Sequence, residues 1–264
     1  MRFFKMHNLC NDYIYTFSKN ITPKKIKRLC NRNSGIGADG VIIISKPNDY
    51  YALEVFNSDA SRATFCGSAC LSAGFYLYKK GLVGKKFTLL TGAGKRKMSV
   101  ISNNAIKIYC PYGNFNIDKS VSDCGKIINR LLTFNYCGEQ IKVRCSGVWV
   151  GNFHLVIFAD YSFDQMQKIT LAINSDNRFK NGVNIVFACI TGDKIKLTVC
   201  ERGSGFTKAC ISGGFACLSV LKKLGFKGKK VRLCYAGGIA HGMLLEKRLA
   251  IVCEPKMVFE GNCK

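Results

Sequence analysis

The chain has 264 residues, of which 48% are hydrophobic, and its 40 Lys and Arg residues outnumber its 16 Asp and Glu residues to give a formal net charge of +24. This hydrophobic content excludes an intrinsically disordered chain, and no apolar run approaches the roughly 20 residues that cross a bilayer. The basic residues form short scattered clusters, so we expect a generally basic surface with neither a specific nucleic-acid partner nor a membrane partner.

Residues 1–7 carry charges inside their apolar stretch, which predicts a first strand rather than a signal peptide and, by default, a cytoplasmic protein. Fifteen cysteines would indicate a disulfide scaffold in a short secreted chain, but their number is odd and the chain is long. A metal site is not expected either, because no Cys-x-x-Cys pair occurs and the three histidines lie far apart. Most of the cysteines are therefore predicted to be small buried hydrophobic residues.

Short runs of β-branched and aromatic residues predict strands, and two apolar segments rich in small residues predict helices. Both of these segments end in lysines followed by a glycine, which is a typical helix end. In chain order the expected elements are a strand at 1–7, a strand at 41–44, a helix at 68–80, a strand at 87–90, strands at 155–158 and 196–199, and a helix at 212–223.

The chain repeats itself once. Residues 65–72 align with 209–216 at an offset that also matches strands and glycines over about fifty positions, which indicates a duplicated unit. We therefore expect two pseudo-symmetric lobes, at 1–112 and 113–255, with the tail 256–264 returning to the first. Each lobe is predicted to be a curved, mostly antiparallel sheet or barrel around one central helix, an α/β fold of the α+β type.

The repeat makes Cys66 and Cys210 equivalent residues at the starts of the two predicted helices. A helix N-terminus presents unpaired N–H groups and a partial positive charge, which can bind a carboxylate and lower the pKa of a nearby thiol. In a cleft between the lobes, one thiolate could remove the α-proton of an amino acid while the other thiol protonates the opposite face. Such a pair is suited to inversion of a stereocentre.

Seven motifs in order make the chain resemble the diaminopimelate epimerase family over nearly its whole length. The first lobe carries four of them and the second carries three. They are KMHNLCNDY at 5–13, GIGADG at 35–40, FNSD at 56–59, CG at 66–67, GNFH at 151–154, GVN at 182–184 and ERGSG at 201–205.

The resemblance implies a cofactor-independent enzyme that interconverts LL- and meso-diaminopimelate in lysine and peptidoglycan precursor biosynthesis. It assigns acid–base catalysis to Cys66 and Cys210, and the tuning of their proton affinities to His154 and Glu201. Backbone N–H groups of Gly67, Ser68, Ile211 and Ser212 would hold the reacting carboxylate. The distal end of the substrate would be held chiefly by Asn11, Asn57, Asn152, Asn184 and Arg202, with Glu201 beside them. No metal is implied, and a homodimer is expected.

Two departures from the family pattern bear on the substrate. Ser68 stands where Asn is usual, and Ile211 stands where Gly is usual, at a position where a β-branched residue could not comfortably adopt a positive φ. They favour the first alternative, a racemase or epimerase of another amino acid, with a histidine-like or lanthionine-like substrate. A catalytically dead basic nucleic-acid-binding protein and a thiol–disulfide enzyme are the more distant alternatives.

Overall fold

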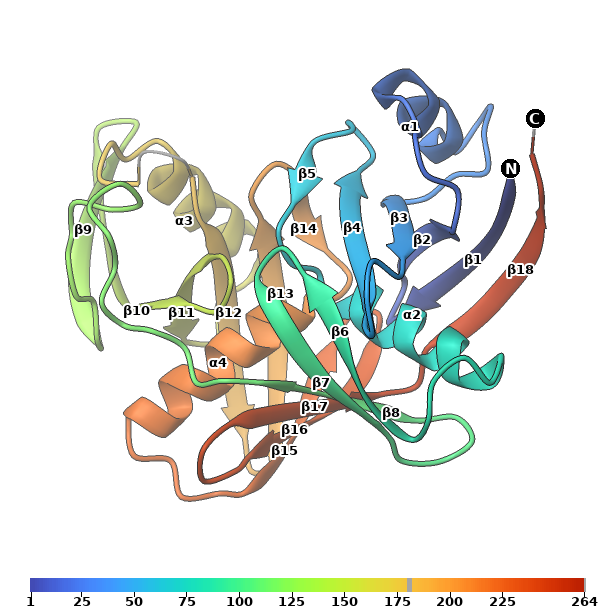
Figure 1. Cartoon of the computed structure of the whole chain (residues 1–264). Coiled ribbons are helices and arrows are strands. Elements are labelled where there is room, and N and C mark those ends of the chain that lie inside the picture. The colour runs from blue at the N-terminus through green and yellow to red at the C-terminus, as the bar shows by residue number, and fades with distance from the viewer. Residues whose placement is uncertain (180–181, 264) are drawn as a thin grey trace. The chain divides into compact units, whose positions relative to one another are not determined.

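The computed structural model describes residues 1–179 and 182–263 and divides the chain into two compact units (Figure 1). Unit 1 comprises residues 1–109 together with the chain from Val252 onward, and unit 2 comprises residues 110–251. Among the described residues, no helix is both long enough and apolar enough to span a membrane.

Unit 1 is a curved sheet that surrounds one buried helix. Its elements are β1 (Arg2–Asn8), β2 (Asn11–Thr16), α1 (Pro23–Cys30), β3 (Gly40–Ser45), β4 (Tyr51–Asn57), β5 (Arg62–Ala63), α2 (Gly67–Lys79), β6 (Lys86–Thr91), β7 (Gly94–Val100), β8 (Ile106–Cys110) and β18 (Lys256–Asn262). Residues 67–77 of α2 are all buried, and this helix contacts β1 and β2 on one side and β7 on another. A sheet that reaches the helix from both sides must curve around it.

The strand order of unit 1 follows from its pairings. β18, β1 and β2 pair antiparallel, β2 and β3 pair parallel, β3 and β4 pair antiparallel, and β4 then pairs parallel with β6, which continues antiparallel to β7 and β8. Figure 1 shows β18 beside β1, so that the two chain ends lie close together. The backbone oxygen of Met1 correspondingly accepts a hydrogen bond from the N–H of Cys263.

Unit 2 has the same plan. Its elements are β9 (Arg130–Tyr136), β10 (Glu139–Trp149), β11 (Phe153–Phe158), α3 (Phe163–Asn174), β12 (Asn184–Thr191), β13 (Lys194–Glu201), β14 (Gly205–Thr207), α4 (Ile211–Lys223), β15 (Lys230–Tyr235), β16 (Gly238–Leu244) and β17 (Leu249–Cys253). Residues 211–221 of α4 are all buried, against β10, β11, β12 and β16.

The predicted internal repeat is confirmed for the buried helix of each unit and for the strands that follow it. At the offset of 144, α2 coincides with α4, β6 with β15, and β7 with β16, residue for residue. The pairing also repeats, because β11 runs parallel to β12 as β2 does to β3, and β13 runs parallel to β15 as β4 does to β6. The glycines that follow the two helices, Gly81 and Gly225, have φ values of 71° and 86°, as a glycine helix end requires.

The expectation of one helix per lobe is incomplete, because each unit carries a second helix. The first, α1, begins with Pro23 after the N-cap Thr22 and buries Ile26, Leu29 and Cys30. The second, α3, begins with a capping box between Ser162 and Gln165. Both starts follow known N-terminal signals, Thr-Pro and Ser-x-x-Gln, so the sequence already contained the evidence for them.

Candidate active site

Cys66 is the N-cap of α2, where its backbone leaves the helix in an extended conformation. Its Sγ accepts a hydrogen bond from the backbone N–H of Ala69 at 3.4 Å, and its thiol donates to the hydroxyl of Tyr13 at 3.4 Å. Gly67 and Ser68 are the first two residues of α2, so their N–H groups belong to the first turn, which has no partners within the helix. This half of the predicted site therefore combines a thiol with an anion-binding helix end.

Asn11 and Asn57 lie on the same sheet as Tyr13, the residue that contacts this thiol. Asn11 is two residues before Tyr13 on β2, so the two side chains share a face of the sheet. Tyr13 is in register with Gly40 on β3, and Gly40 is in register with Asn57 on β4. A Cβ on Gly40 would lie 2.8 Å from the Tyr13 ring, so glycine gives this ring its space. The amide of Asn57 donates to Ser61 Oγ at 2.9 Å, a turn contact of the kind common for Asn.

A partly exposed ion-pair network is centred on Asp12, the residue that follows Asn11. Arg32 donates to both carboxylate oxygens of Asp12, at 3.2 and 2.7 Å, and Lys5 Nζ lies 2.9 Å from the same carboxylate. Asp39 accepts from the Asp12 N–H at 3.0 Å and from Arg32 at 2.8 Å. Burial alone would raise the pKa of Asp12, but the hydrogen bonds from Arg32 and Lys5 outweigh it and lower this pKa to about 2. The network fixes the strand that carries Asn11 and Tyr13.

Cys210 is the N-cap of α4, and its Sγ accepts from the Gly213 N–H at 3.3 Å. The expected lowering of a thiol pKa by the helix end is wrong for this residue. Cys210 is 4% exposed, and burial raises its pKa well above the usual value, with the negative charge of Glu201 adding to the rise. Desolvation of the thiolate thus outweighs the helix N-terminus.

His154 and Glu201 both belong to the surroundings of Cys210. His154, on β11, is fully buried, and burial lowers its pKa to about 4, so the ring is neutral at pH 7. Its Nδ1 lies 3.3 Å from the Asn152 carbonyl oxygen, and its Nε2 lies 3.4 Å from Ser212 Oγ. Glu201 ends β13, and its carboxylate accepts from the Thr207 hydroxyl at 2.7 Å.

The three predicted distal-binding residues of unit 2 differ in how far they are already engaged. Asn184 donates to the Phe153 carbonyl at 3.0 Å and accepts from the Arg202 N–H at 2.9 Å, so it holds three segments together. Arg202 is an exposed side chain. The side-chain oxygen of Asn152 is buried and has no hydrogen-bond partner among the described residues. Of the two amides, Asn152 thus has the acceptor that is still available to a ligand.

Ile211 raised a concern about backbone strain that the structure removes. It is the first residue of α4 and is not among the non-glycine residues with positive φ. This residue is 1% exposed. A β-branched residue is therefore accommodated at this position without the strain expected from the family's glycine.

Two side chains that contact the cysteines were missed by sequence reasoning. In the sequence Tyr13 is only part of a motif, and the family resemblance implicates Ser212 only through its backbone N–H. The Ser212 hydroxyl lies 3.2 Å from Cys210 Sγ. A hydroxyl two residues after the cysteine was a usable signal for Ser212, whereas the contact between Tyr13 and Cys66 spans 53 residues and depends on the fold.

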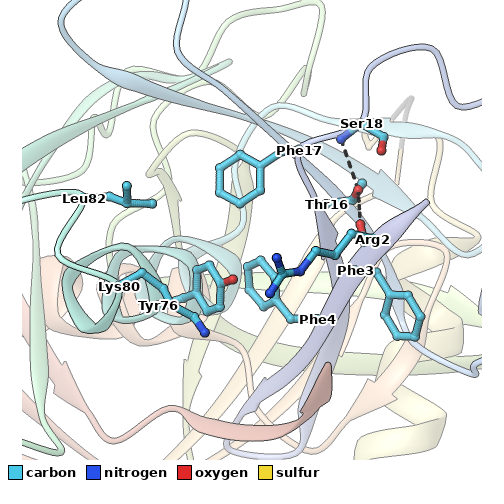
Figure 2. Close-up of a pocket in the computed structure, with 9 residues that line it drawn as sticks. All are labelled: Arg2, Phe3, Phe4, Thr16, Phe17, Ser18, Tyr76, Lys80 and Leu82. Carbon is cyan, nitrogen blue, oxygen red and sulfur yellow. Dashed lines mark hydrogen bonds between the residues drawn. The ribbon is translucent and has the colours of Figure 1, made fainter. Parts of the chain in front are cut away.

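Unit 1 also has a surface pocket with a volume of about 440 Å³ that contains none of the predicted site residues (Figure 2). Tyr76, which stacks on Phe4 with ring centroids 3.5 Å apart, lines it together with Lys80 and the exposed Phe17. These α2 residues lie near the C-terminal end of the helix, whereas Cys66 caps its N-terminus. The pocket is therefore separate from the half-site around Cys66.

Comparison with known proteins identifies the family. The family model for diaminopimelate epimerase matches residues 3–113. The diaminopimelate epimerase of Rickettsia bellii (strain OSU 85-389) is 33% identical over 255 residues, covering 94% of this chain and 90% of the relative. That of Rickettsia akari (strain Hartford) is 32% identical and covers 99% of this chain and 97% of the relative.

Similar solved structures have the same fold at low sequence identity. The probable proline racemase of Agrobacterium radiobacter K84 matches with a TM-score of 0.72 at 13% identity, covering 100% of this chain and 92% of the other. A hydroxyproline epimerase from Agrobacterium vitis matches with a TM-score of 0.66 at 12% identity, covering 99% and 90%. Because the relatives at 32–33% identity span nearly the whole chain, the protein belongs to the diaminopimelate epimerase family.

Proposed function

We propose that this protein is an isomerase that interconverts LL- and meso-diaminopimelate with Cys66 and Cys210 as its two acid–base groups. The observation that carries the proposal is that these two cysteines cap equivalent helices in a chain that matches diaminopimelate epimerases over 94% of its length. A role in lysine and peptidoglycan precursor biosynthesis follows from this substrate and belongs to the same proposal.

Each half-site supplies one proton-transfer group and one anion-binding helix end. A thiolate removes the α-proton, the carbanion is planar, and a thiol on the other face returns a proton, so that the configuration inverts. The N–H groups of Gly67, Ser68, Ile211 and Ser212 are first-turn groups that suit the carboxylate next to the reacting carbon. The approach of both thiols to one α-carbon is a requirement of the proposal.

The distal amino-acid group of the substrate suits the polar side chains that remain. Arg202 offers a bidentate grip on a carboxylate, and the buried oxygen of Asn152 can accept from an ammonium group. Asn11, Asn57 and Asn184 complete the proposed distal contacts, with Asn184 acting mainly by holding the backbone of Arg202. A substrate with only one amino-acid end would offer these side chains no second amino-acid group to bind.

No cofactor belongs to the proposed mechanism, because two thiols and a helix dipole supply the proton transfers and the charge stabilisation. Dialysis against a chelator, without added pyridoxal phosphate, should accordingly leave epimerisation unchanged.

The test is α-proton exchange in deuterated water, followed by mass spectrometry and chiral chromatography. Both stereoisomers of diaminopimelate should gain deuterium at the inverted centre and approach one equilibrium mixture from either side. Lanthionine, histidine and proline should be run beside them. Exchange on histidine or proline without exchange on diaminopimelate would overturn the proposed substrate and favour an amino-acid racemase.

A further inference from the structure

We infer that the hydroxyl of Ser212 is a proton relay that couples the Cys210 thiol to His154. Ser212 would then be a positioning residue that acts through the thiol, in addition to any contact made by its N–H group. The inference rests on the proposed acid–base role of Cys210, and it extends that role to a side chain assigned so far only through its backbone.

Three groups from two elements form the chain of contacts. Ser212 Oγ, in the first turn of α4, lies 3.2 Å from Cys210 Sγ and 3.4 Å from His154 Nε2 on β11. All three side chains are buried, with Ser212 5% exposed and His154 fully inaccessible. The serine hydroxyl is therefore the group that contacts both the thiol and the imidazole.

The Asn152 carbonyl determines the direction of these hydrogen bonds. It lies 3.3 Å from His154 Nδ1, and because a carbonyl oxygen can only accept, Nδ1 carries the ring proton. Burial keeps the ring neutral, so Nε2 is bare and accepts from the Ser212 hydroxyl. The serine oxygen then has lone pairs directed to the thiol, which donates. The thiol of Cys210 therefore donates to the serine hydroxyl, and the serine hydroxyl donates to the histidine ring.

Proton transfer along this chain is balanced. The S–H bond of Cys210 breaks and its electron pair stays on sulfur, while the proton bonds to Ser212 Oγ. The original Ser212 proton moves to His154 Nε2. The products are a thiolate, a neutral serine and an imidazolium, and the reverse steps return the thiol.

The surrounding charges explain why such a relay is useful. Burial and the carboxylate of Glu201 on β13 both disfavour a lone thiolate at Cys210. The Gly213 N–H at 3.3 Å and the Ser212 hydroxyl favour it, while the Tyr235 hydroxyl on β15 is engaged with the Cys210 carbonyl at 3.1 Å. Burial also disfavours the imidazolium of His154. An imidazolium formed in the same step lies close to the thiolate, however, and in a buried site their attraction offsets part of the desolvation cost of both charges.

The equivalent position in unit 1 provides a natural contrast. Ser68 stands at the offset of 144 from Ser212, and its hydroxyl is buried without a hydrogen-bond partner among the described residues. Cys66 instead donates to Tyr13. The serine on α4 is thus engaged in a contact that its counterpart on α2 does not make.

The test is the pH dependence of iodoacetamide alkylation in the absence of substrate, measured for each cysteine by peptide mass spectrometry. Ser212→Ala should slow alkylation of Cys210 at neutral pH by about tenfold or more, since removal of a general-base partner costs that much or more. Ser212→Thr and Ser212→Val have the same shape and differ in the hydroxyl. In the Ser212→Thr variant, the alkylation rate of Cys210 should stay within about threefold of that in the unmodified protein. In the Ser212→Val variant, this rate should fall as it does in Ser212→Ala. Ser68→Ala should leave the Cys210 profile unchanged.

A double mutant separates a relay from two independent effects. His154→Gln combined with Ser212→Ala should be no slower than Ser212→Ala alone, because both changes interrupt one path. The alkylation rate of Cys66 in the same samples is the control for folding, because an intact fold should leave this rate as it is in the unmodified protein. Equal Cys210 rates in the Thr and Val variants, or additive effects of Ser212 and His154, would overturn the relay. Neither outcome depends on whether diaminopimelate is the substrate, which the exchange assay decides separately.

Discussion

Cys66 and Cys210 have nearly the same backbone conformation, with φ and ψ of −135° and 112° at the first and −136° and 108° at the second. Each caps a 13-residue helix and accepts a hydrogen bond from the N–H three residues later. Their side-chain surroundings differ, because Tyr13 contacts one thiol whereas Ser212 contacts the other. The two thiols thus have the same backbone geometry and differ in the side chain that each one contacts.

Replacement of either capping cysteine tests the two-thiol mechanism. Cys66→Ala and Cys210→Ala should each lower kcat for epimerisation by at least about a hundredfold, since each removes a general acid–base group. Cys137→Ser is the matched control, because Cys137 is an exposed thiol in a turn and should retain activity. The measurement is the approach to equilibrium by chiral chromatography. Near-normal turnover in either alanine variant would contradict the mechanism.

Arg202 tests the distal end of the proposed substrate. Arg202→Ala should raise KM for diaminopimelate at least about tenfold and change kcat much less, because the side chain is assigned to the end that does not react. Arg202→Lys keeps the charge without the bidentate geometry, so its KM should lie between those of the unmodified protein and Arg202→Ala. Steady-state kinetics with both stereoisomers gives both constants. A fall in kcat with unchanged KM would place Arg202 at the reacting carbon instead.

The Asp12 network should make an acid-sensitive contribution to stability. The folded-state pKa of about 2 lies below the ordinary value of 3.8, so the carboxylate stabilises the fold above pH 4, and this contribution is lost as the pH falls through 2. Asp12→Asn should lower the free energy of unfolding by about 2 kcal/mol at pH 7, which corresponds to the pKa difference.

Urea unfolding at pH 7 and at pH 3 measures this contribution, and the difference between Asp12→Asn and the unmodified protein should shrink at the lower pH. Asp118→Asn, which replaces a carboxyl at an exposed turn, should have a much smaller effect. Equal losses in the two variants would mean that Arg32 and Lys5 do not stabilise Asp12.

His154 should add a second pH dependence in a different range. Burial lowers its pKa from 6.5 to about 4, so below pH 6.5 the unfolded chain takes up a proton that the buried ring does not. The free energy of unfolding should therefore fall as the pH drops from 6.5 to 4, by about 3 kcal/mol from this residue. His154→Gln should flatten the profile over that interval, whereas His241→Gln, at an exposed position of β16, should not. Parallel profiles for the two variants would contradict a neutral buried His154.

The sequence by itself determined the repeat and the position of its cysteines. The 144-residue offset follows side-chain patterns that persist over short stretches, and those patterns predicted both cysteine-capped helices and the strands around them to within a few residues. The sequence also encodes where α1 and α3 begin, by Thr22 with Pro23 in α1 and by Ser162 with Gln165 in α3. Periodicity, caps and helix-ending glycines act between residues close in sequence, so they can be recognised without coordinates.

Only the tertiary structure decided the chemistry of the side chains. Burial overrides the helix end at Cys210, and the contact between Ser212 and His154 joins residues 58 apart. The partners of Asn184 also depend on the fold. This residue is predicted to bind substrate, and in the structure its side chain is hydrogen-bonded to the backbones of Phe153 and Arg202. Desolvation and hydrogen-bond partners depend on which strands pack together, and a pattern along one strand carries no information about what covers it.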